Sequence, residues 1–191
     1  MNFVHRPLCR SAMWRRVLEQ HVVPWVLEGV DLGDDVLEVG PGPGLTTDII
    51  RNRSAAVTAV EIDPHLAATL AKRLQGTNAT VLEGDATALR FEGPRFSAAV
   101  SFTMLHHVPS PELQDRLLRE VHRVLRPGGV FVGTDSLMSL GMRLMHVLDT
   151  LIPVDPTTFG GRLESAGFRD VAVETNEYAF RFRAVRASAA A

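Results

Sequence analysis

The sequence predicts an α/β fold built on a doubly wound sheet of seven strands. Two observations lead to this prediction. Short apolar runs alternate with helical patterns over most of the chain, as expected of parallel strands joined by helical crossovers. The last two apolar runs are separated by only a few residues, too few for a crossover. They must therefore form a hairpin, which adds an antiparallel strand at the C-terminal end of the sheet.

The expected strands are apolar or β-branched runs bounded by turn residues. They lie at residues 36–39, 56–61, 80–83, 96–102, 130–134, 171–174 and 178–183. The helices between them carry clear start and stop signals. Asp63-Pro64 and Ser110-Pro111 each combine an N-cap with a first-turn proline, and Ala166-Gly167 ends the last helix. A further helical pattern from Arg10 to Leu27 is expected to pack over the edge of the sheet.

Composition excludes several classes of protein. The 191 residues carry 20 basic and 22 acidic side chains, a net charge of −2, so a protein that mainly coats nucleic acid is not expected. Cys9 is the single cysteine, which excludes an intramolecular disulfide and cysteine-based zinc binding. No run of 18 apolar residues is present, so no transmembrane segment is expected and the predicted location is cytoplasmic. Oligomeric state remains open.

The turn after the first strand is rich in glycine and proline. It reads Gly40-Pro41-Gly42-Pro43-Gly44, at the edge where open α/β sheets bind their ligands. A dinucleotide fingerprint would have its third glycine at the position of Leu45. Both prolines lack the backbone N–H that a pyrophosphate needs. The turn therefore suits a ligand without phosphates.

Acidic residues follow the first three strands. Glu61 ends the second strand, where a carboxylate can accept the two hydroxyls of a ribose. Glu38 lies beside the turn and could attract an ammonium group, and Asp85 could accept from the amino group of an adenine. An adenine, a ribose and an amino-acid tail without phosphate describe S-adenosylmethionine.

These motifs resemble the cofactor motifs of class I S-adenosylmethionine-dependent methyltransferases. The resemblance rests on residues 36–44, 60–63 and 84–86, and on the helix-to-strand segment 121–129. It implies a Rossmann-like fold, S-adenosylmethionine as cofactor, and methyl transfer by in-line displacement. By resemblance, the glycine turn (Gly40, Gly42, Gly44) approaches the methionine part and Glu61 holds the ribose. Ile62 packs on the adenine, Asp85 and Ala86 address the base, and Ser101 lines the site.

The resemblance also divides the chain, which we expect to form one domain over residues 1–191. An N-terminal helical cap (1–34) precedes the cofactor-binding core (35–135), and a lid-like helical segment (136–165) precedes the C-terminal hairpin (166–186). The segment at 137–152 has an apolar helical stripe of leucines and, beside it, three methionines: Leu137, Leu140, Leu144, Leu148 and Leu151, with Met138, Met142 and Met145. This helix is expected either to pack on the sheet or to cover a lipophilic or aromatic acceptor.

Two branches of the family remain to be distinguished. The cofactor half is also similar to ribosomal RNA adenine dimethylases, but those enzymes carry Asn-x-Pro-Tyr after the fourth strand, where this chain has Ser101-Phe102-Thr103-Met104. Leu105-His106-His107-Val108 and the stretch 126–129 instead resemble the small-molecule branch, which includes quinone-biosynthesis C-methyltransferases. We therefore expect a small-molecule acceptor and disfavour nucleic acid. An rRNA adenine N6-methyltransferase-like enzyme and a non-catalytic S-adenosylmethionine-binding protein are the alternatives.

The candidate residues for the acceptor side follow the fourth and fifth strands. His106 is a candidate general base, because histidine titrates near neutral pH. His107 and Asp135 are candidates for substrate contact, although Asp135 could instead cap the next helix. His106 and His107 would point in different directions on a helix, and no spacing typical of a metal site is present. No metal is therefore predicted.

Overall fold

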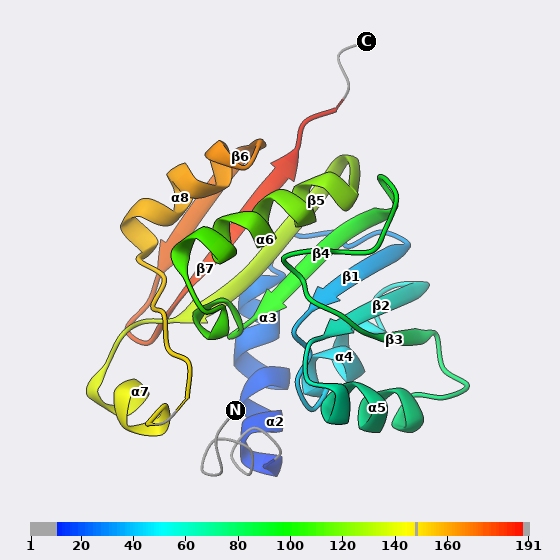
Figure 1. Cartoon of the computed structure of the whole chain (residues 1–191), viewed down its shortest axis with the longest axis horizontal. Coiled ribbons are helices and arrows are strands. Elements are labelled where there is room, and N and C mark those ends of the chain that lie inside the picture. Colours follow the sequence, from blue (N-terminus) through cyan, green and yellow to red (C-terminus); the bar gives the residue numbers. More distant parts are fainter. Residues whose placement is uncertain (1–10, 148, 189–191) are drawn as a thin grey trace.

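The computed structural model describes residues 11–147 and 149–188. Seven strands form one sheet with the order β3-β2-β1-β4-β5-β7-β6 (Figure 1). The strands are β1 (Asp35–Val39), β2 (Ala56–Glu61), β3 (Ala79–Glu83), β4 (Phe96–Phe102), β5 (Leu125–Ser136), β6 (Phe168–Thr175) and β7 (Ala179–Arg186). β1 to β5 run parallel to one another, whereas β7 is antiparallel to both β5 and β6. The predicted fold class, including the C-terminal hairpin, is confirmed.

The helices lie on both faces of this sheet. They are α2 (Ala12–Val17), α3 (Val23–Val26), α4 (Leu45–Ile50), α5 (Pro64–Arg73), α6 (Pro111–Val124), α7 (Leu140–Met145) and α8 (Pro156–Ser165), with a π-helical turn η1 (Leu18–Val22) and a 3-10 turn η2 (Leu105–His107). Asp63 caps α5 by accepting from the backbone N–H groups of His65 and Leu66, and the Ser110 hydroxyl caps α6. Both predicted helix starts are confirmed.

Two apolar cores form because successive strand residues point to opposite faces. On β5, Val130 and Val132 face a core with α3 and α4, whereas Phe131 faces a core with α6 and α8. β1 repeats the pattern, with Val36 in the first core and Leu37 in the second. The sheet is therefore covered on both sides (Figure 1), as a doubly wound fold requires.

The predicted N-terminal helix is interrupted. α2 and α3 are separated by the π-helical turn η1, which ends two residues before Pro24, a residue that has no backbone N–H to donate. Val23 and Val26 of α3 are buried in the core that α3 shares with α4, so the predicted packing against the sheet is correct for this part. Arg10, where the helix was predicted to begin, and Cys9 lie outside the described residues.

The prediction of a long helix over 137–152 is wrong. Ser139 caps a helix of only six residues, α7, and the chain then turns back toward η2. Leu140 and Leu144 are 78% and 68% exposed, so their stripe does not pack on the sheet. Met142 of the predicted methionine face is buried, whereas Met138 is 40% exposed. Nothing is described of the Met145 side chain, and Leu148 lies outside the described residues.

Within the described residues, no helix combines the length and the apolar character needed to cross a bilayer. The division of the chain into a cap, a core, a lid-like segment and a hairpin stays a prediction. β5 also differs from expectation, because it starts at Leu125, directly after α6, instead of at Val130.

Gly133 and Gly161 provide a matched test of packing. A Cβ on Gly133 would lie 2.2 Å from the carbonyl oxygen of Ser101 and 2.6 Å from the Phe182 ring. A Cβ on Gly161, in α8, would meet nothing within 4 Å. We expect Gly133→Ala to lower the free energy of unfolding by about 2–3 kcal/mol through overpacking, and Gly161→Ala to raise it by about 0.5–1 kcal/mol. Urea unfolding of both variants measures this, and equal effects would contradict the packing described.

Candidate active site

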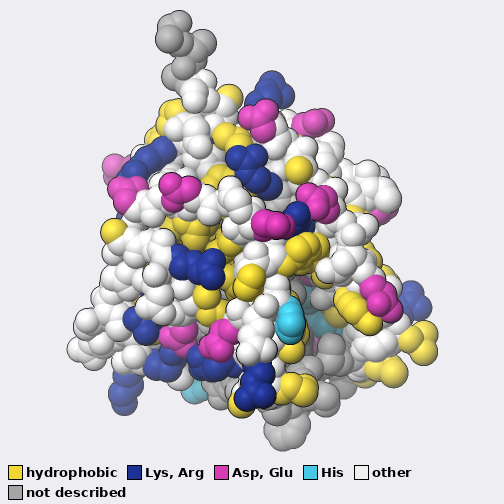
Figure 2. All heavy atoms as spheres, turned by 180° about the vertical axis from the view of Figure 1, so that it is seen from behind, with side chains coloured by type: hydrophobic (Ala, Val, Ile, Leu, Met, Phe, Trp, Pro, Cys, Tyr) yellow, Lys and Arg dark blue, Asp and Glu magenta, His cyan; other side chains and the backbone are white. Residues whose placement is uncertain are grey.

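A cavity of about 360 Å³ lies beyond the carboxyl ends of β1, β2 and β4. Seven predicted site residues line it: Gly40, Gly42, Glu61, Ile62, Asp85, Ala86 and His107. Its apolar wall consists of Phe102, Met104, Val108, Pro109, Leu113 and Leu117. Figure 2 shows histidine side chains within a hollow on the face opposite to the view of Figure 1, among hydrophobic side chains. The cavity has the size of a typical small-molecule site.

The glycine turn forms one wall of the cavity. Gly40 has a φ of 66°, and a Cβ there would lie 2.1 Å from the Cγ of Met104. The amides of Gly40, Gly42 and Gly44 donate to Val60, Glu61 and Pro41. Since these three donors are used internally and Pro41 and Pro43 have none, the turn offers no cradle for phosphate. The expectation of a ligand without phosphates fits this arrangement.

Gly44 differs from the prediction. It adopts a φ of 80° at the N-cap of α4, and a Cβ there would lie 2.3 Å from the Leu70 side chain on α5. It does not line the cavity. A glycine is needed at position 44 because α4 and α5 approach each other closely there. Gly44 therefore allows the glycine turn to pack against α5 without itself contacting the cavity.

Glu61 connects the glycine turn to the end of β2. Its Oε2 accepts the Gly42 N–H at 2.8 Å, and its Oε1 accepts the Asp63 N–H at 3.0 Å. The side chain is only 6% exposed, yet it lines the cavity. Each carboxylate oxygen keeps acceptor capacity beyond its one backbone bond, so the group can still receive hydroxyl donors from a ligand.

Glu38 is closer to the core than predicted. It points to the α4 face of the sheet, is 1% exposed and does not line the cavity. The Thr46 hydroxyl, which does line the cavity, donates to Oε1, whereas Oε2 has no hydrogen-bond partner among the described residues. Burial raises the pKa of Glu38 to about 7, against the lowering effect of the hydrogen bond from Thr46. Any effect of Glu38 on a ligand in this arrangement passes through Thr46.

Three further predicted residues are buried beside the cavity and do not line it. Ser101 is fully buried on β4, because the strand continues to Phe102 and the cavity is reached only at Phe102, Thr103 and Met104. His106 and Asp135 are 2% and 0% exposed. The structure therefore places none of the three in contact with a ligand in the cavity.

Asp135 nevertheless lies on the predicted side of the sheet and meets His106. Its Oδ1 is 2.5 Å from His106 Nδ1 and also accepts the Ser136 N–H, while its Oδ2 accepts the His106 backbone N–H. The N-cap of α7 is Ser139, so Asp135 does not cap that helix. Asp135 positions η2, and η2 carries His107 into the cavity lining.

The chain after α7 is fastened to the same turn. Ile152 N–H donates to the His106 carbonyl at 2.8 Å, and the Gln114 side-chain amide donates to the carbonyls of Leu105 and Ile152. Asp149 and Thr150, which come before this anchor, line the cavity. The segment 136–165 therefore contributes to the site through Asp149 and Thr150, between α7 and α8, and not through a long helix.

Sequence reasoning missed several lining residues. Trp14 of α2 lines the cavity, although only packing was expected of its helix. Thr103 also lines the cavity. It has a φ of 49°, an uncommon conformation for a β-branched residue, at the bend where the chain leaves β4 and continues to Met104. Neither position carries a local signal, because Trp14 depends on how the N-terminal helices turn and Thr103 on a backbone conformation invisible in the sequence.

Comparison with known proteins agrees with this geometry. Residues 36–129 match the family described as "Methyltransferase domain". A ubiquinone biosynthesis O-methyltransferase of Pseudomonas fluorescens Pf-5 is 35% identical over 165 residues, which cover 76% of this chain and 69% of that protein. The chain belongs to the S-adenosylmethionine-dependent methyltransferase family. The class I resemblance inferred from the motifs is thereby confirmed.

Other members of the methyltransferase family differ in what they act on. A probable ribosomal RNA small subunit methyltransferase A of Thermococcus onnurineus is 37% identical over 95 residues, 50% of this chain and 33% of that protein. The chain thus spans about a third of the length of that relative. The structure of a SAM-dependent methyltransferase from Aquifex aeolicus has a TM-score of 0.75 at 19% identity and covers 97% of this chain and 99% of its own. It shows that the fold is shared.

The cofactor of this family, S-adenosylmethionine, suits the residues present. The cavity lining contains Glu61, Asp63, Asp85 and Asp149 and, within the described residues, neither lysine nor arginine. A cationic ligand with ribose hydroxyls and no phosphate matches this donor and charge pattern. Ile62 is 67% exposed at the cavity, where an apolar face of a bound base would cover it.

Glu38 predicts a specific pH dependence of stability. Because its folded-state pKa is about 7 and its ordinary value is 4.5, the folded protein keeps a proton that the unfolded chain releases between these values. The free energy of unfolding contributed by Glu38 should therefore fall by about 3 kcal/mol as pH rises from 4.5 to 7. Urea unfolding across this range, compared with Glu38→Gln, measures the difference. Parallel curves for the two proteins would contradict the raised pKa.

Proposed function

We propose that this methyltransferase transfers a methyl group from S-adenosylmethionine to a small acceptor with an apolar or aromatic body. S-adenosylmethionine supplies a methyl group already activated by a sulfonium, so the protein must mainly bind, align and exclude water. The observation that carries the proposal is the lining of the cavity. It combines a carboxylate-rich end with an apolar wall.

One end of the cavity would bind the cofactor and the other end the acceptor. Glu61 and Asp85, at the ends of β2 and β3, would receive the ribose and the base of the cofactor. The apolar wall, which includes Met104 and Leu113, would receive the acceptor and shield the transfer from water. His107 is the titratable side chain on the acceptor side of the lining and would contact the acceptor.

A small molecule is favoured over RNA by the charge of the site. Four carboxylates line the cavity without a lysine or arginine in the described lining, which disfavours a phosphate backbone. The extent of similarity supports the same choice. The rRNA relative of Thermococcus matches over 95 residues, whereas the ubiquinone O-methyltransferase of Pseudomonas fluorescens Pf-5 matches over 165.

Glu61→Gln tests the cofactor end. The change keeps the shape of the side chain but removes the charge and one acceptor, so the Kd for S-adenosylhomocysteine should rise about 10–100-fold. The matched control is Glu83→Gln, since Glu83 is paired with Glu61 in register on β3 but is exposed and outside the cavity lining. Calorimetry should find the control unchanged. Equal binding by the two variants would remove Glu61 from the site.

The acceptor end is tested by competition between substrate classes. Radioactive methyl incorporation should be seen with small catechols, phenols or quinols, and small ribosomal subunits lacking the adenine modification should remain unlabelled. The reverse result would overturn the small-molecule proposal. Tight S-adenosylhomocysteine binding without incorporation into either class would instead indicate a non-catalytic binding protein.

A further inference from the structure

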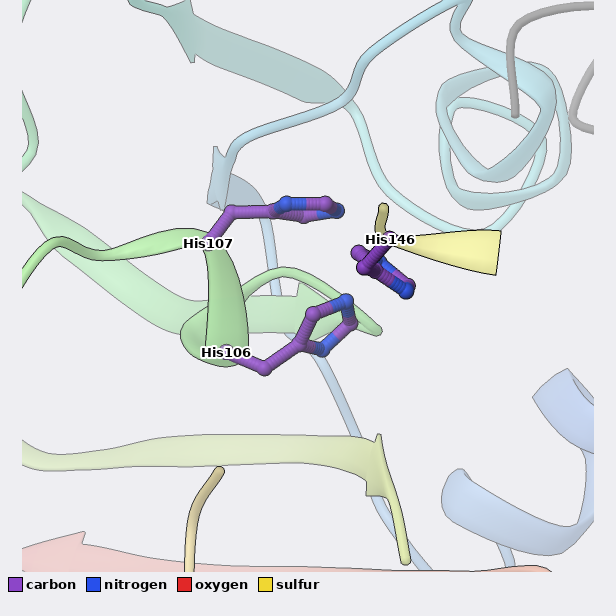
Figure 3. A group of neighbouring side chains, drawn as sticks. All are labelled: His106, His107 and His146. Carbon is purple, nitrogen blue, oxygen red and sulfur yellow. The ribbon is translucent and has the colours of Figure 1, made fainter. Parts of the chain in front are cut away.

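Three histidines from two distant segments meet beside the cavity. His106 and His107 belong to η2, and His146 follows α7. Each offers a ring nitrogen, and these three nitrogens lie within 4.8 Å of one another. Figure 3 shows the three rings turned toward a common space. The ring centroids are 4.2 to 5.1 Å apart, so the predicted divergence of His106 and His107 is wrong.

Hydrogen bonds determine which nitrogen His106 and His146 present to this space. His106 Nδ1 is 2.5 Å from the Asp135 carboxylate, and His146 Nδ1 is 2.8 Å from the Met142 carbonyl. Both oxygens can only accept, so in each neutral ring Nδ1 carries the hydrogen and Nε2 carries a lone pair. His106 Nε2 is buried and has no hydrogen-bond partner among the described residues.

This pattern is typical of metal ligands. A histidine that binds a metal commonly donates its other N–H to a carboxylate or a backbone carbonyl, which fixes the ring and increases its basicity. Asp135 is 0% exposed, and among the described residues its side chain has no ion pair with a lysine or arginine. His106 therefore has a buried carboxylate on Nδ1, the partner that a metal-binding histidine commonly has on its second ring nitrogen.

We propose that His106, His107 and His146 form a binding site for a divalent transition metal, Zn²⁺ foremost. Imidazole nitrogens suit zinc, and three histidines leave a fourth tetrahedral position open. With metal–nitrogen distances of about 2.1 Å, tetrahedral ligand atoms lie about 3.4 Å apart. Binding therefore requires the rings to approach by at most about 1.4 Å, which His146 can supply because it follows a short helix at the surface of the fold.

The histidine cluster borders the proposed acceptor site. His107 lines the cavity together with Thr150, so a metal ion on the cluster would lie at its wall. There it can bind a hydroxyl or thiol of the acceptor and lower its pKa, with the released proton passing to water. This role rests on the proposed function, whereas the metal site itself does not.

Zinc titration of the chelator-treated full chain tests the site. Calorimetry should find one equivalent bound with an apparent Kd of about 1 μM or tighter. Co²⁺ should give the intense visible bands of a tetrahedral site. Since loss of a supporting partner costs 10–100-fold in affinity, His107→Gln and His146→Gln, which each remove a ligand, should cost at least about 100-fold. The positioning variant Asp135→Asn should weaken zinc binding about 10–100-fold and shift the Co²⁺ bands.

The control is the double variant His21→Gln and His65→Gln, since both side chains are exposed and lie outside the cluster. It should bind zinc like the unchanged protein. Loss of binding in this variant, wild-type affinity in both His107→Gln and His146→Gln, or no stoichiometric binding at all would overturn the proposal. Thermal unfolding of the metal-free variants verifies their folding, and if His146→Gln does not fold, the partly exposed His107 still decides the test.

S-adenosylhomocysteine titrations in the same samples separate this proposal from the proposed function. Zinc binding without S-adenosylhomocysteine binding would leave the metal site standing and overturn the function. S-adenosylhomocysteine binding without zinc binding would do the opposite.

Discussion

The site depends on the position of β1 in the sheet. β1 pairs with β2 on one side and with β4 on the other, so the chain leaves it in opposite directions. The segments that follow β1 and β4 lead away from each other at the carboxyl ends of these strands. Their separation leaves space there. The glycine turn, Glu61 and Thr103 all border this space. Their places follow from one topological choice and not from separate local preferences.

Within that space, two glutamates of similar sequence context are placed in different environments. Glu61 accepts hydrogen bonds from two backbone N–H groups, those of Gly42 and Asp63, and borders the cavity. Glu38 is enclosed against α4 and accepts a hydrogen bond from Thr46, and burial raises its pKa. The difference arises because Glu38 lies on a covered face of β1 whereas Glu61 lies at the open end of β2, so one carboxyl group borders the cavity and the other lies beneath it.

The sequence was sufficient for the fold and for many of the residues that border the cavity, while their role in cofactor binding stays a prediction. Alternating apolar strands, Asp63 and Ser110 as caps, and the glycine turn are local signals, and local signals predict local structure well. Ser101 was expected to line the site but does not line the cavity, because a shift of one residue along a strand turns a side chain to the other face. The long helix expected over 137–152 is absent, because a helical spacing of apolar residues does not establish that the fold offers a surface to bury them. His146 could not be placed beside His106, since only the tertiary path of the chain joins them.

Ile152 and Gln114 fasten the chain between α7 and α8 to η2, which limits how far α7 can move from this turn. His146 is six positions before the anchor at Ile152, and such a length spans at most about 20 Å when fully extended. The tether therefore gives His146 a high effective concentration near His106 and His107, whatever path α7 takes. It also limits how far α7 can be displaced by an acceptor. The reach of a short stretch of chain, more than the shape of the helix, would then limit the size of the molecule that the methyltransferase admits.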